Sequence, residues 1–97
     1  MFGFGRSREL DDFATGLARE FIGLIPPGAD LPAAQKVAKA VDQVCNRAKS
    51  YYREHSLGIY GRARVGTAFK LELKHAGYSD EFVNDLTRQL LFIMSGK

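Results

Sequence analysis

The chain has 97 residues and a formal net charge of +3, and 45% of its residues are hydrophobic. This length is typical of one domain, and the composition is that of a globular rather than a disordered protein. Its single cysteine, Cys45, excludes an internal disulfide. No apolar run approaches the roughly 20 residues of a membrane span, and the N-terminus lacks the apolar core of a signal peptide. We therefore expect one cytoplasmic domain over residues 1–97, with residues 1–6 as a flexible tail.

The first predicted helix covers residues 7–25. Ser7 is the expected N-cap, and Pro26 ends the helix because the residue before a proline is pushed out of the helical region. Its apolar side chains recur at helical spacing and form one stripe, which consists of Leu10, Phe13, Leu17, Phe21 and Leu24.

The second predicted helix covers residues 31–55 and has the clearest amphipathic pattern of the chain. Asp30 can cap it, Pro32 is tolerated in its first turn, and Gly58 is the expected stop. One face carries most of the apolar side chains, namely Val37, Val41, Val44, Ala48, Tyr51 and Tyr52.

The third segment, residues 59–76, carries two conflicting patterns. Phe69 and Leu73 share one face of a helix, but residues 69–74 also alternate strictly between apolar and charged side chains, as a strand does. A hairpin over residues 60–74 is therefore the alternative. The strong helix formers in the segment and the Ala76-Gly77 stop favour a helix.

The fourth predicted helix covers residues 80–94. Ser79 is its N-cap, and two acidic residues follow in the first turn, where they face the positive end of the helix dipole. Together the four segments predict an all-α domain of three to four helices packed around one core.

The residues that could perform chemistry do not converge. Cys45 and His55 lie about 15 Å apart along one helix and on different sides of it, so they cannot form a dyad within that helix. With His75 they also lack the spacing of a metal site. We therefore predict no catalytic residues, no metal, no cofactor and no enzymatic activity.

Basic residues concentrate in the middle of the chain. Residues 47–75 hold seven lysines and arginines and two acidic residues. Clustered cations suit a polyanion, so an alternative function is the binding of a nucleic acid or another polyanion. The candidate residues are Arg47, Lys49, Arg53, Arg64, Lys70 and Lys74.

Apolar side chains in excess of one stripe suggest a partner-binding surface. Leu91 and Phe92 fall off the main stripe of the fourth helix, and Phe2 and Phe4 lie in the N-terminal tail. Such surplus apolar surface either enters the core or contacts a partner. The main prediction is therefore a non-enzymatic helical interaction module that binds a protein partner or itself.

Overall fold

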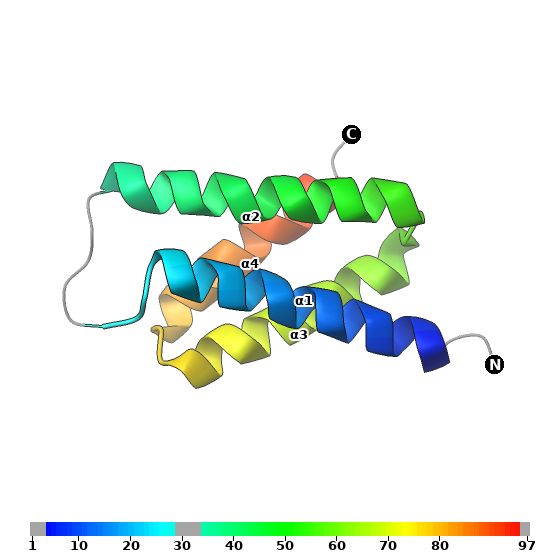
Figure 1. Cartoon of the computed structure of the whole chain (residues 1–97), viewed down its shortest axis with the longest axis horizontal. Coiled ribbons are helices and arrows are strands. Elements are labelled where there is room, and N and C mark those ends of the chain that lie inside the picture. Colours follow the sequence, from blue (N-terminus) through cyan, green and yellow to red (C-terminus); the bar gives the residue numbers. More distant parts are fainter. Residues whose placement is uncertain (1–3, 29–33, 96–97) are drawn as a thin grey trace.

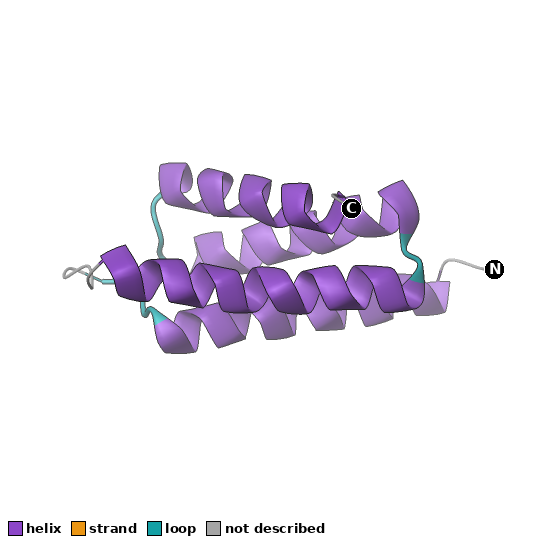
Figure 2. Cartoon of the chain, turned by 90° about the horizontal axis from the view of Figure 1, so that it is seen from above, coloured by secondary structure: helices purple, strands orange, loops and turns teal. Residues whose placement is uncertain are grey.

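A computed structural model describes residues 4–28 and 34–95, which form a bundle of four α-helices (Figure 1). The helices are α1 (Phe4–Leu24), α2 (Ala34–His55), α3 (Gly58–Ala76) and α4 (Asp80–Ser95). The described residues contain no strand, which confirms the all-α prediction. Figure 2 shows the helices lying alongside one another, with the connections confined to the two ends of the bundle.

Each helix packs against two others. α1 packs against α2 and α3, and α4 packs against the same two helices. α2 and α3 are consequently diagonal to each other, and Figure 1 shows them on opposite sides of the bundle. The surface between α2 and α4 therefore lies opposite the surface between α1 and α3.

The helical assignment of α3 is decided by which side chains enter the core. Phe69 and Leu73 are fully buried, whereas Leu71, which lies between them, is 51% exposed. A strand would place Phe69, Leu71 and Leu73 on one face, but a helix turns Leu71 away. The alternative of a hairpin over residues 60–74 is wrong, because core burial follows the helical and not the alternating pattern.

Local signals set the helix ends between α3 and α4. The backbone N–H of Phe82 donates to Ser79 Oγ at 3.2 Å, which confirms the predicted N-cap. Gly77 has φ 111°, a left-handed conformation that suits glycine, and its N–H donates to the Lys74 carbonyl at 3.1 Å. This tight turn brings α4 back along α3.

The start of the chain differs from the prediction. α1 begins at Phe4, so Ser7 is not its N-cap, and residues 4–6, which were assigned to the tail, belong to the helix. No proline interrupts this stretch, and serine is tolerated inside a helix at a modest cost in propensity. Residues 1–3 lie outside the described part of the chain, as do Asp30 and Pro32 of the predicted second N-terminus.

An aromatic cluster joins the end of α1 to the turn between α3 and α4. The hydroxyl of Tyr78 donates to the carbonyl of Ile25, and its ring lies 5.8 Å from that of Phe21 and 5.4 Å from that of Phe82. Burial raises the pKa of Tyr78 to about 12, so the hydroxyl remains a donor even at pH values where an exposed tyrosine ionises. The cluster fixes one end of the bundle.

Candidate functional site

A groove of about 570 Å³ lies between α2 and α4. Its walls are mostly apolar and come from both helices. The apolar lining includes Val37, Ala38, Val41, Phe82 and Leu86, and the polar lining consists of Asp42, Asp85 and Gln89.

The groove exists because the apolar face of α2 is wider than the core that it covers. Val44 and Ala48 are fully buried, whereas Val37 and Val41 are only half-buried. The pairs 37/41, 38/41 and 38/42 are three or four positions apart, which places these residues on neighbouring rows of one helix surface. Across the groove from this surface of α2, α4 presents Phe82, Leu86 and Gln89.

Two carboxylates give the groove a negative rim. Asp42 lies on the α2 wall and forms no ion pair with the described residues, and Asp85 lies on the α4 wall. Arg88 approaches Asp85 at 3.5 Å, but both side chains are exposed, so solvent screens this contact. The rim can therefore attract a positively charged group.

Cys45 lies one turn beyond the α2 residues of the groove. It is 5% exposed, and burial raises the pKa of its thiol to about 11, with the Asp42 carboxylate adding to the rise. The thiol is therefore protonated at neutral pH and behaves as a small buried apolar group, which makes it a poor nucleophile.

A second hollow, which shares Gln89 with the groove, lies further along α4 toward the C-terminal end of the helix. This shallow hollow of about 290 Å³ is formed by Gln89 with Arg88, Phe92 and Ile93. Phe92 is 73% exposed, so its side chain lies on the surface and not in the core. Among the described residues it is the most exposed phenylalanine.

Leu91, the neighbouring candidate for partner binding, packs against another helix of the bundle. It is half-buried, and a Cβ atom built on Gly66 would lie 2.7 Å from its Cδ2 atom, so Leu91 packs directly over this glycine of α3. Arg62 of α3 donates to the Leu91 carbonyl at 3.3 Å. Of the tail candidates, Phe2 lies outside the described residues, and Phe4 is helical but its side chain is not described.

Three of the six cations predicted for polyanion binding have an acidic partner in the structure. Arg47 pairs with Glu20 of α1, and Lys74 approaches Asp80 at 3.9 Å. Arg64 donates to both carboxylate oxygens of Asp11 at 2.9 Å, and these hydrogen bonds lower the pKa of that carboxyl. The six residues are divided between α2 and α3, which are diagonal in the bundle: Arg47, Lys49 and Arg53 belong to α2, and Arg64, Lys70 and Lys74 belong to α3.

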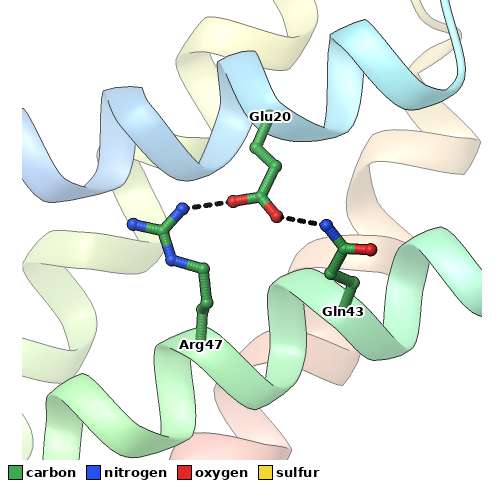
Figure 3. Close-up of polar contacts among 3 residues, drawn as sticks. All are labelled: Glu20, Gln43 and Arg47. Atoms are coloured by element: carbon green, nitrogen blue, oxygen red, sulfur yellow. Dashed lines mark hydrogen bonds and ion pairs between the residues drawn. The ribbon is translucent and has the colours of Figure 1, made fainter.

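The environment of Arg47 shows that its role is to join α1 to α2 (Figure 3). Glu20 accepts hydrogen bonds from both Arg47 and Gln43, the latter at 2.7 Å. The Arg47 guanidinium also lies 5.8 Å from the centre of the Phe13 ring, and Phe13 stacks on Tyr51 at 3.8 Å. These contacts hold the cation against the bundle and reduce its availability to a ligand.

The surface of α3 also carries exposed apolar side chains. Ile59, Tyr60 and Leu71 are 76%, 65% and 51% exposed. Tyr60 and Leu71 border a hollow of about 400 Å³ lined almost wholly by α3 residues. This face lies across the bundle from the groove.

Sequence reasoning missed the groove as a site, although it identified several of the residues that line it. Val37 and Val41 belong to the predicted apolar stripe of the second helix. The signal that could have found the groove is the width of that stripe, because a single core seldom covers so many positions on one helix.

The described residues contain no group of three or more histidine, cysteine, aspartate and glutamate side chains able to hold a metal ion. Within the same part of the chain, no helix combines the length and apolarity that crossing a bilayer requires. Comparison with protein families, curated proteins and solved structures finds no match in any of the three.

Proposed function

We propose that the chain is a non-enzymatic interaction module that binds protein through the surface between α2 and α4. The observation that carries this proposal is the groove of about 570 Å³, which is apolar along its length and open between two helices. Grooves of this kind receive the apolar face of an amphipathic helix in several known recognition modes.

The arrangement of the groove supports protein rather than a small molecule as the ligand. Its lining has half-buried valines, an aromatic ring and only three polar side chains, and the second hollow, which shares Gln89, includes the exposed Phe92. An elongated apolar strip with a polar rim matches the anatomy of a protein interface, where aromatic side chains supply much of the affinity.

Site-specific photo-crosslinking in the cells of origin tests the proposal. A photoreactive amino acid at Gln89, in the groove, should give discrete protein adducts. The same amino acid at Lys39, an exposed position of α2 that does not line the groove, should not. Filling the groove by Ala38→Trp should abolish the Gln89 adducts. Equal labelling from both positions, or none from either, would contradict the proposal.

The alternative, binding of a nucleic acid or another polyanion, has less support. Arg47, Arg64 and Lys74 each face a carboxylate, and the six candidate cations are split between two diagonal helices. A phosphate backbone binds best to cations that are clustered and unpaired. Its test is salt-dependent binding to generic RNA or DNA that Lys70→Glu and Lys74→Glu weaken.

A further inference from the structure

We propose that the occupant of the groove is the outer face of α3 of a second copy of this chain. This inference rests on the proposed function and names the partner. It starts from two apolar surfaces of the described residues, which are the groove between α2 and α4 and the row of exposed side chains on α3.

The outer face of α3 has the pattern of a helix that inserts into a groove. Tyr60, Ala63, Thr67 and Leu71 follow one another at intervals of three or four residues and line one side of the helix. Anchors at this spacing are typical of helix-in-groove recognition. Ala63 and Thr67 are small and exposed, so the helix can approach a partner closely between the two larger side chains.

The two surfaces agree in length. Tyr60 and Leu71 are separated by about 16 Å along α3, at 1.5 Å per residue. The strip on α4 from Phe82 through Gln89 to Ile93 has the same length of about 16 Å by the same rise. Both large anchors of α3 can therefore contact the strip at once.

The groove has an acidic rim, whereas the α3 face contains the Asp11–Arg64 ion pair and is bordered by two lysines. The groove carries Asp42 and Asp85, with Arg88 beside the latter. Lys70 and Lys74 lie beside Leu71 on α3. Lys70 forms no ion pair among the described residues, whereas Lys74 lies 3.9 Å from Asp80, which is exposed. Lysines of one copy can therefore meet the acidic rim of the next, which favours this orientation over a like-with-like pairing of grooves.

The geometry makes the contact heterologous. The groove and the outer face of α3 lie on different sides of the bundle, because α3 is diagonal to α2. One copy can then accept an α3 face and present its own, so that association continues beyond a dimer unless the rotation closes a ring. A single-helix contact buries little area, so we expect dissociation constants of about 10 μM to 1 mM.

Sedimentation analysis of the full chain over a range of concentrations tests the inference. The average mass of the wild type should rise with concentration, exceed that of a dimer, and fall when salt is added. Leu71→Asp on the α3 face, and the pair Asp42→Lys and Asp85→Lys on the groove, should each weaken association by at least about 10-fold. The pair Asp12→Lys and Glu54→Lys changes the net charge equally at exposed positions outside both surfaces and should leave association unchanged.

Mixing the two defective variants is the decisive measurement. The Leu71→Asp chain keeps an intact groove, and the Asp42→Lys, Asp85→Lys chain keeps an intact α3 face. Together they should form a 1:1 dimer with the affinity of the wild-type contact, and this dimer should not grow. If the mixture stays monomeric while the wild type associates, the contact is not α3 in groove and the inference is overturned.

The failure of this inference is distinguishable from the failure of the proposed function. A wild-type chain that stays monomeric at every concentration overturns the inference. If Gln89 then still gives adducts with a different protein, the groove binds protein but not a second copy. If the wild type is monomeric and Gln89 gives no adduct, both proposals fail.

Discussion

The two opposite sides of the bundle differ in how closely their helices meet. On the α1–α3 side, Ala14 and Ala18 are fully buried and share a face of α1 with Asp11, which holds Arg64 by two hydrogen bonds. On the α2–α4 side, Val37 and Phe82 are half-buried and a groove remains between the helices. Small side chains let two helices approach, whereas larger side chains leave space. The helices therefore meet more closely on the α1–α3 side, although Asp11 and α3 line a surface hollow there, than on the α2–α4 side with its groove.

The largest expected effect comes from removing a ring on each side of this comparison. Phe69 of α3 is fully buried, so Phe69→Ala should lower the free energy of unfolding by about 3–5 kcal/mol. Phe82 is half-buried at the edge of the groove, so Phe82→Ala should cost only about 1–2 kcal/mol. Urea unfolding measures both. If Phe69→Ala does not fold, Phe69→Leu against Phe82→Leu gives the same ranking, and equal losses would mean that the two sides are packed alike.

Enlarging one alanine on each side should give a smaller but more discriminating difference. Ala18→Leu adds volume where none is available and should destabilise the bundle by about 1–3 kcal/mol. Ala38 is exposed on the wall of the groove, so Ala38→Leu should change stability by less than about 0.5 kcal/mol. Thermal or urea unfolding of the matched pair checks this. A groove that is closed in solution would make the two costs similar.

Neutralising the Asp11–Arg64 ion pair of the α1–α3 side should have a smaller effect on stability, and this effect should depend on pH. Arg64 lowers the pKa of Asp11 below its ordinary value of 3.8, so the pair adds stability above that pH, and this contribution is lost as the pH falls through the folded-state pKa. Asp11→Asn should therefore be slightly less stable than the wild type at pH 7, and the difference should vanish in acid. Both side chains are about 40% exposed, so salt should reduce the effect. A difference that persists at low pH would assign the loss to packing instead.

The last prediction concerns reactivity rather than stability. Cys45 lies beside the groove but is buried, and its pKa of about 11 leaves roughly 100-fold less thiolate at pH 7 than an ordinary thiol with a pKa of 9.0. Labelling by a thiol reagent should therefore be slow in the native chain, accelerate as the pH rises toward 11, and become fast in denaturant. Fast labelling at pH 7 would show that the α2–α4 side opens down to its core.

The sequence predicted the helical content well because the signals are local. The sequence predicted both the Ser79 N-cap and the helix end at Gly77. In the third segment, the helical spacing of Phe69 and Leu73 proved the better guide to burial than the alternating pattern around Leu71. The prediction failed at Ser7, where a residue that favours the N-cap lies inside α1. A capping preference is worth about 1 kcal/mol, which the extension of a helix can offset.

The candidate site was harder to predict, because its residues come from helices far apart in the sequence. Leu91 and Phe92 both fall off the main apolar stripe of the fourth helix, yet the first packs over Gly66 and the second is exposed. Likewise, nothing in the sequence indicates that Arg47 pairs with Glu20 or Arg64 with Asp11. Each of these outcomes depends on which helix becomes the neighbour.

The sequence by itself predicted three to four helices, most of their ends and the majority of the core, because period, capping and propensity act within a few residues. Only the tertiary structure decided that α2 is diagonal to α3, which cations meet carboxylates, and where apolar surface is left uncovered. Those features depend on how closely and at what angle distant helices pack, and the shapes of side chains on both partners set that jointly.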